Sequence, residues 1–324
     1  MSKTRMSRML AACLLCAATS VSVAAGWPDK PVRVIVVYPP GGVSDTVTRA
    51  ISEELSVRLK TPFVVENKGG AGGTVGMAAV AKADADGYTI GFSSISPLAL
   101  SPLISKVAYD PGKDIAPVAS VMVSPVVLLG TSAFKGKSIH DVISQSKTAP
   151  GSLRWATSGP GSVGHLMLEQ FQHDAEVSVT HVPYKGSAQQ QNDALGGQFE
   201  LISTNVSSAL IGHIERDALR AIAIAAPKRA AFLPEVPTFS ELGYARANKM
   251  SVFGFFAPGG TPDAIVTRLN TEINEVVAMP KIQELLKGSS NIPMSGTPQD
   301  FSKAISEELQ SNRELIGSAG LKLQ

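Results

Sequence analysis

The feature that most constrains the fold is the regular alternation of short β-branched runs with stretches of helical periodicity along the chain. The first unit is the clearest, because the run Val32–Tyr38 ends in Pro39-Pro40-Gly41-Gly42. Ser44 or Asp45 can then cap a helix that reaches about Lys60. Repeated units of this kind predict an α/β fold built on parallel strands.

The alternation is interrupted near residue 125, where two apolar runs follow each other without a helix between them. A second α/β unit then begins with a helix near 138–147. The late helical stretches 262–278 and 298–316 have only one strand-like run, 252–257, before them, so we expect them to pack on the first unit. The pattern therefore predicts two lobes, 26–124 plus 246–324 and 125–245, with a ligand cleft between them.

The N-terminus has the pattern of a signal peptide. Lys3, Arg5 and Arg8 precede the apolar stretch Met9–Ala18, and Val23-Ala24-Ala25 offers small residues for cleavage. We expect residues 1–25 to be removed and the mature protein to be exported. The apolar stretch is shorter than the ~20 residues that span a bilayer, which argues against a permanent membrane anchor.

Composition excludes several classes of function. Cys13 and Cys16 are the only cysteines and lie in the leader, so the mature chain has no disulfide, thiolate nucleophile or cysteine metal ligand. Its 26 basic and 27 acidic side chains leave a net charge of −1, which argues against nucleic acid as a partner. The five histidines are scattered, so we expect no metal site and no cofactor.

Two Gly-rich turns follow strands and open helices: residues 38–45, and residues 156–162 with Gly159-Pro160-Gly161 at their centre. Helix N-termini carry unpaired N–H groups and a partial positive charge, so two such turns facing each other could hold a carboxylate. Ordinary capping and tight turns are the alternative for either turn alone. A dinucleotide site is disfavoured, because Pro160 stiffens the turn and no acidic residue follows at the usual spacing.

Motifs typical of enzymes are missing from the sequence. It has no G-x-S-x-G elbow, no H-E-x-x-H and no P-loop, and His165 is better explained as a satisfied or exposed histidine than as a ligand contact. We therefore expect no catalytic residues.

The segments WPDKPVRVIVVYPPGGVSD, VPYKG and FLPEVPTFSELGY occur in this order. Together they resemble the Bug-type periplasmic receptors of tripartite tricarboxylate transporters, and the resemblance runs from Trp27 to the C-terminus. It implies a two-lobed, type II-like periplasmic-binding fold that closes on a small carboxylate.

The resemblance also implies which residues contact the ligand. They come from the two Gly-rich turns, from the residues after the strand near 90–92, from the PYKG loop, and from the end of the strand 201–204. The residues are Tyr38, Pro40, Gly41, Gly42, Val43, Ser44, Ser94, Ser96, Ser158, Gly159, Gly161, Ser162, Pro183, Tyr184, Thr204 and Asn205. A packed aromatic ring is the alternative for Tyr184.

Two departures from the family pattern bear on the ligand. Pro160 stands where the family usually has Asn, and Thr204 stands where it usually has Asp before Asn205. Without that carboxylate, a partner for a ligand ammonium is missing. The sequence therefore favours an organic acid, a dicarboxylate or an aromatic carboxylate over an amino acid.

The expected function is thus that of a monomeric periplasmic receptor that delivers a carboxylate to large and small membrane subunits of a transporter. Two alternatives stay open. The same cleft could serve a ligand-sensing partner of a membrane signalling protein, and an exported hydrolase or isomerase would need a base and a nucleophile in the cleft.

Overall fold

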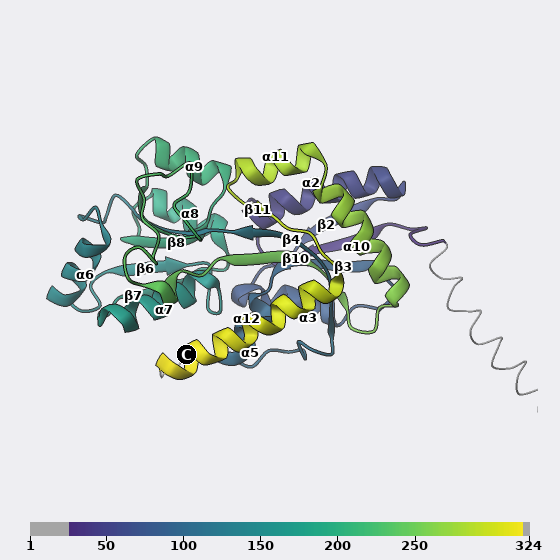
Figure 1. Cartoon of the computed structure of the whole chain (residues 1–324), viewed down its shortest axis with the longest axis horizontal. Coiled ribbons are helices and arrows are strands. Elements are labelled where there is room, and N and C mark those ends of the chain that lie inside the picture. Colours follow the sequence, from purple (N-terminus) through teal and green to yellow (C-terminus); the bar gives the residue numbers. More distant parts are fainter. Residues whose placement is uncertain (1–25, 320–324) are drawn as a thin grey trace, which may run out of the picture.

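The computed structural model describes residues 26–319 and divides them between two β-sheets, each with helices on both faces (Figure 1). The expected signal peptide, residues 1–25, lies outside the described residues. No helix in the described part of the chain combines the length and apolar character needed to cross a bilayer.

The first sheet has six strands in the order β11-β4-β10-β3-β1-β2. Its strands are β1 (Val32–Val36), β2 (Phe63–Asn67), β3 (Thr89–Ser94), β4 (Ile115–Ser124), β10 (Ser251–Pro258) and β11 (Ile292–Pro293). β1 pairs in parallel with β2 and β3, whereas β10 runs antiparallel to both β3 and β4.

The second sheet has five strands in the order β7-β6-β8-β5-β9. Its strands are β5 (Val126–Gly130), β6 (Arg154–Thr157), β7 (Thr180–Pro183), β8 (Leu201–Asn205) and β9 (Arg220–Ala225). β6 is parallel to β7 and β8, and β5 is antiparallel to β8 and β9.

The predicted α/β class is confirmed, but both sheets are mixed, so the expectation of parallel strands holds only for β1 with β2 and β3 and for β6 with β7 and β8. The physical reason lies in how the chain changes lobes. β4 continues into β5 through Pro125 alone, and β10 enters the first sheet directly from the other lobe. Neither connection is a helical crossover of the kind that makes neighbouring strands parallel.

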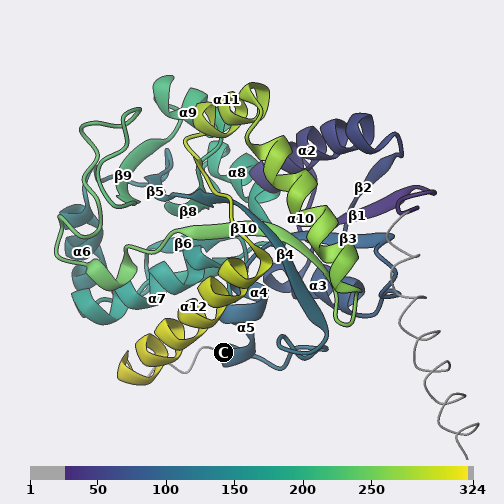
Figure 2. The same ribbon diagram turned by 45° about the vertical axis from the view of Figure 1, so that its right-hand side comes forward.

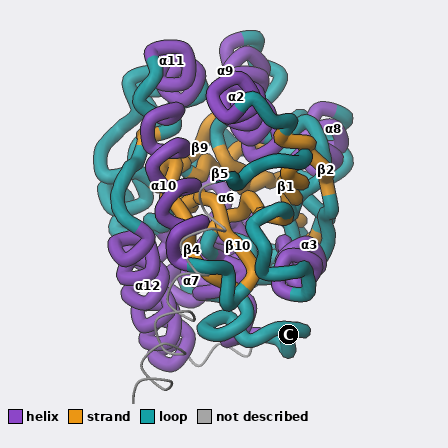
Figure 3. Tube along the Cα trace, turned by 90° about the vertical axis from the view of Figure 1, so that its right-hand side faces the viewer, coloured by secondary structure: helices purple, strands orange, loops and turns teal. Residues whose placement is uncertain are grey.

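Helices cover both faces of each sheet (Figures 2 and 3). Their bounds are α2 (Val43–Leu59), α3 (Thr74–Ala81), α4 (Ser96–Ala99), α5 (Ser101–Ile104), α6 (Ile139–Thr148), α7 (Val163–Ala175), α8 (Ser187–Leu195), α9 (Ser208–Glu215), α10 (Asp263–Val277), α11 (Pro280–Gly288) and α12 (Pro298–Ala319), with short 3₁₀ turns at Ala71–Gly73 and Ala245–Ala247.

Apolar residues of β1, β3 and β10 pack on α2, α10 and α11 on one face, and apolar residues of β1, β4 and β10 pack on α3, α4 and α12 on the other. The prediction that the late helices α10 and α12 pack on the first unit is confirmed. In the second sheet, α6 and α7 cover one face, and α8 and α9 cover the other.

Two segments connect the sheets: the β4–β5 junction at Pro125 and residues 226–250, which lead from β9 to β10. Each sheet has its own buried core, so we treat them as two lobes and retain 26–124 plus 246–324 and 125–245 as the proposed division. The Asn205 side chain lies at this junction, donating to the carbonyls of Ser124 and Pro125 at 3.4 Å.

Candidate functional site

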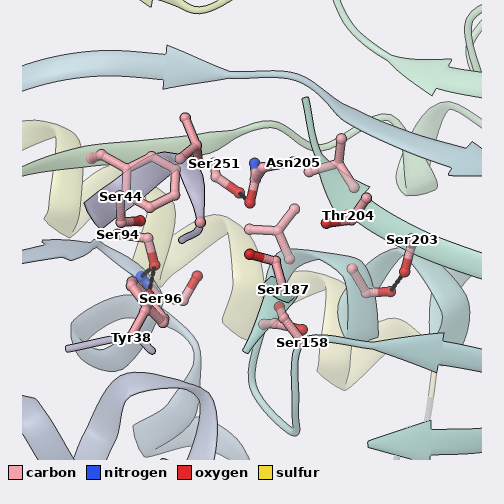
Figure 4. Close-up of a pocket in the computed structure, with 17 residues that line it drawn as sticks. Tyr38, Ser44, Ser94, Ser96, Ser158, Ser187, Ser203, Thr204, Asn205 and Ser251 are labelled. Carbon is pink, nitrogen blue, oxygen red and sulfur yellow. Dashed lines mark hydrogen bonds between the residues drawn. The ribbon is translucent and has the colours of Figure 1, made fainter. Parts of the chain in front are cut away.

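A cavity of about 40 Å³ lies between the lobes, where strand ends and helix N-termini from both sheets meet (Figure 4). It is lined by Tyr38, Gly42, Val43, Ser44, Ser94, Ser96, Val126, Ser158, Ser162, Val163, Gly164, Ser187, Ser203, Thr204, Asn205, Ser251 and Phe253. Most of these side chains are hydroxyls, and none belongs to Asp, Glu, His, Lys or Arg.

The first wall is the N-terminus of α2. The expectation that Ser44 or Asp45 caps this helix was wrong: Gly42 is the N-cap residue and makes no side-chain cap. Asp45 instead accepts hydrogen bonds from the Gly41 amide at 3.0 Å and from Arg49 Nε at 3.0 Å. Val43 and Ser44 of the first turn therefore present an uncapped helix terminus to the cavity.

Asp45 stays negatively charged in this position. Burial alone would raise its pKa, but hydrogen bonds from Arg49, the Gly41 amide and Asn67 lower the pKa below its ordinary value. Asp45 thereby fixes the loop without carrying its charge into the cavity lining.

The second wall is the N-terminus of α7. The second Gly-rich turn opens this helix, as predicted: Ser162 caps it by accepting from the His165 amide at 3.2 Å, and Val163 and Gly164 follow in the first turn. Gly159 shapes the loop before it: its φ is +126°, and a Cβ atom there would lie 2.8 Å from Tyr184 O. A side chain at this position would meet both backbone strain and a carbonyl oxygen.

A third helix, α8, also begins at the cavity. Ser187 is its first residue, and its N-cap residue Gly186 provides no side-chain cap. Three helix N-termini, one from the first lobe and two from the second, thus point partial positive charge at one small space.

Hydroxyl and amide groups complete the lining. The Tyr38 hydroxyl and Ser94 Oγ lie 2.7 Å apart, and Ser94 Oγ also accepts from the Ser96 amide at 3.3 Å. Burial raises the pKa of Tyr38, so this phenol is neutral. Across the cavity, Ser251 Oγ donates to Asn205 Oδ1 at 3.4 Å, which joins the start of β10 to the end of β8.

This arrangement can hold an anion through N–H groups and hydroxyls. It contains no charged side chain that could pair with a ligand ammonium, and no Ser–His or Cys–His pair that could activate a nucleophile.

The structure brings ten of the sixteen predicted residues to the cavity: Tyr38, Gly42, Val43, Ser44, Ser94, Ser96, Ser158, Ser162, Thr204 and Asn205. Six do not line it. Pro40 and Pro183 are exposed, and the Gly41 N–H is taken by Asp45. Gly159 and Gly161 shape the loop from behind the lining.

Tyr184 is the sixth predicted residue that does not line the cavity. It is a packed aromatic side chain, which was the alternative given for it. Its ring packs on Phe199 at a centroid distance of 5.7 Å, and its hydroxyl donates to Asp193 at 2.7 Å. Burial, followed by the Asp193 contact, raises the pKa of Tyr184 to about 12.

Sequence reasoning missed seven lining residues: Val126, Val163, Gly164, Ser187, Ser203, Ser251 and Phe253. Val126, Ser251 and Phe253 lie at the beginnings of antiparallel strands, which a parallel-sheet prediction places at the opposite edge. Ser187 was missed because only Pro183 and Tyr184 were named from the PYKG loop that precedes it. For Ser203, the hydroxyl next to predicted Thr204 was an available signal.

The chain is similar to known proteins over almost its whole length. A family model described as "Tripartite tricarboxylate transporter family receptor" matches residues 47–321. Protein BugT of Bordetella pertussis (strain Tohama I) is 35% identical over 327 residues, covering 100% of both chains.

Two solved structures share the fold closely. The R. palustris protein Rpa4515 with adipate has a TM-score of 0.85 at 32% identity, covering 91% of this chain and 98% of that one. MatC from Rhodopseudomonas palustris with bound malate has a TM-score of 0.85 at 28% identity, covering 90% of this chain and 100% of that one.

Proposed function

The chain belongs to the tripartite tricarboxylate transporter receptor family, and on this premise we propose that it captures a small carboxylate-bearing metabolite in the cavity between its lobes. The family is one of periplasmic solute-binding receptors rather than enzymes. Two similar structures contain adipate and malate, which are both carboxylates.

The observation that carries the proposal is the convergence of three helix N-termini on a cavity without charged side chains. N–H groups and hydroxyls stabilise a carboxylate without a buried cation. An ammonium group would be buried there without an anionic partner, which costs several kcal/mol. The ligand class is therefore organic acids, including dicarboxylates and aromatic acids, and excludes amino acids.

Matched ligand pairs test this proposal. Malate, adipate and benzoate are compared with aspartate, 6-aminohexanoate and benzylamine in thermal-shift and calorimetric titrations. At least one acid should stabilise the protein by ~2.7 kcal/mol at 100 times its dissociation constant. Its amine-bearing counterpart should bind at least about tenfold more weakly. If aspartate binds as tightly as malate, or only a neutral sugar stabilises the protein, the carboxylate proposal fails.

We further propose that the loaded receptor, acting as a monomer, delivers its ligand to large and small membrane subunits of a tripartite transporter. Family membership supports this partnership. The test is uptake of the labelled acid into vesicles that contain the two membrane subunits. Uptake should require the receptor, and vesicles that take up the acid equally without it would overturn the proposed delivery.

A further inference from the structure

Two histidine rings stack directly behind the loop that carries Ser158 and Ser162. The rings of His165 and His181 have centroids 4.4 Å apart and an interplanar angle of 15°. His165 is 5% exposed, and neither ring lines the cavity. The carboxylate proposal gives these two side chains no role.

The hydrogen bonds that fix the loop end at this pair. His165 Nδ1 accepts from the Gly161 amide at 3.3 Å. His181 Nε2 lies 2.7 Å from Thr157 Oγ1, and the same hydroxyl oxygen accepts from the Gly159 amide at 3.2 Å. The His165 ring thus holds Gly161 directly, and the His181 ring holds Gly159 through the Thr157 hydroxyl. These two glycines flank Pro160.

The pair can hold the loop only while His165 is neutral, because an imidazolium has no acceptor nitrogen. Burial, and then the neighbouring His181, lower the pKa of His165 to about 3, and burial lowers the pKa of His181. The acceptor role of Nδ1 places the ring proton on Nε2, which faces Glu169 Oε1 at 3.6 Å. Since the ring is neutral, this contact is not an ion pair.

We propose that His165 and His181 are positioning residues, which set the conformation of loop 157–162 and thereby aim Ser158 and Ser162 at the ligand. The effect of this loop positioning on ligand affinity rests on the proposed function, because both proposals concern the same cavity. The residues act through the Gly161 and Gly159 amides and do not touch the ligand themselves.

Calorimetric titration with malate and adipate tests the role of His165. His165→Leu removes the acceptor and should weaken binding about tenfold or more, because a buried N–H then has no partner. His165→Asn keeps an acceptor oxygen near the position of Nδ1 and should stay within about threefold of the wild-type affinity. His173→Leu is the control, because His173 lies on the same helix, is 39% exposed and contacts Asp174 instead.

The second measurement is hydrogen–deuterium exchange of the peptide spanning residues 157–164, which needs no ligand. His165→Leu should speed exchange there and leave exchange of the β8 peptide unchanged, while His165→Asn should restore slow exchange. Thr157→Val tests the His181 side of the pair and should have the same effect, with Thr157→Ser as its rescue. These two variants also serve if His165→Leu does not fold.

The outcomes separate the two proposals. If the wild-type protein binds no carboxylate but the exchange results follow this pattern, the proposed function fails and the loop-positioning role stands. If His165→Leu or Thr157→Val leaves both loop exchange and carboxylate affinity unchanged, the positioning role is overturned. The positioning role is also overturned if His165→Asn is as damaging as His165→Leu.

Discussion

At the scale of single residues, charged side chains are kept out of the cavity lining, which consists of neutral polar and apolar groups. Ser187 is the residue of α8 that lines the cavity, and the nearest cationic side chain in sequence is Lys185. The Lys185 side chain is exposed and does not line the cavity. Hydroxyls and helix N–H groups therefore provide the polar surface that a ligand meets. Each hydrogen bond to a charged ligand is worth roughly 1.5–3 kcal/mol in such a place.

The exclusion of charged side chains from the lining predicts that Lys185→Ala changes carboxylate affinity by less than about threefold, because an exposed charge is screened by solvent. Ser44→Ala should weaken binding about tenfold or more, because it removes a hydroxyl from the lining. Calorimetric titration of both variants with malate and adipate checks the prediction. A larger loss for Lys185→Ala would mean that a direct ion pair holds the ligand.

The buried His165 side chain leads to a second prediction, which concerns how the free energy of unfolding depends on pH. Its ordinary pKa is 6.5 and its folded pKa is about 3, so between these values the unfolded chain binds a proton that the folded chain does not. Stability from this residue is complete above pH 6.5 and is lost as pH falls towards 3. The loss is about 2 kcal/mol at pH 5.

Urea denaturation at pH 7 and pH 5 measures this loss. His165→Asn should lose less stability between the two pH values than the wild-type protein, by about 2 kcal/mol. The exposed His173→Asn variant should keep the wild-type difference. Equal losses for wild type and His165→Asn would show that His165 does not carry this acid sensitivity.

At the scale of elements, the sequence predicted strands by their apolar runs but could not predict their directions. The runs that became β5 and β10 carry the same β-branched and aromatic signal as parallel strands. Their antiparallel pairing follows from the lobe crossings, at Pro125 and through residues 226–250, which are long-range features of the chain. Ser251 and Phe253 were missed in the site for this reason.

Short helices were the other limit. The four-residue helices α4 and α5 are too short to show a helical period; α4 begins at the cavity residue Ser96, and α5 begins at Ser101. In contrast, the Gly-rich turn 156–162 was predicted to open a helix, and in the structure Ser162 caps that helix, α7. Polar residues at predicted helix starts were therefore good indicators of the site, and strand starts were not.

The N-cap of α7 gives a prediction at this scale. Ser162→Ala removes a cap whose loss costs about 1 kcal/mol, and it also removes a hydroxyl from the cavity. Ser207 is a matched control, because its side chain caps α9 by accepting from the Leu210 amide and does not line the cavity.

Both Ser162→Ala and Ser207→Ala should lower the free energy of unfolding by similar amounts, but only Ser162→Ala should weaken carboxylate binding, by about tenfold. Thermal denaturation and calorimetric titration separate the two effects. If both variants bind malate or adipate like the wild-type protein, the Ser162 hydroxyl serves the helix alone.

At the scale of the whole molecule, the two lobes meet through backbone as well as through side chains. Gly72 of the first lobe lies against Pro160 of the second, where a Cβ atom would clash with the Pro160 carbonyl oxygen. Neither residue lines the cavity. The closeness of the lobes in this structure therefore depends on a position that does not itself contact a ligand, which makes closure testable apart from recognition.

Gly72→Ala should weaken binding of malate or adipate about tenfold or more, because its methyl group would prevent the lobes from approaching at this contact as closely as they do in this structure. Gly72 has φ +64°, so part of any loss of stability comes from backbone strain alone. Gly260→Ala controls for that strain, because Gly260 has φ +82° and open space around it. The two variants should lose similar stability without ligand, whereas only Gly72→Ala should lose affinity.

Small-angle scattering with saturating malate or adipate should show a smaller compaction for Gly72→Ala than for Gly260→Ala. Equal affinity and equal compaction in the two variants would mean that the Gly72–Pro160 contact does not limit closure.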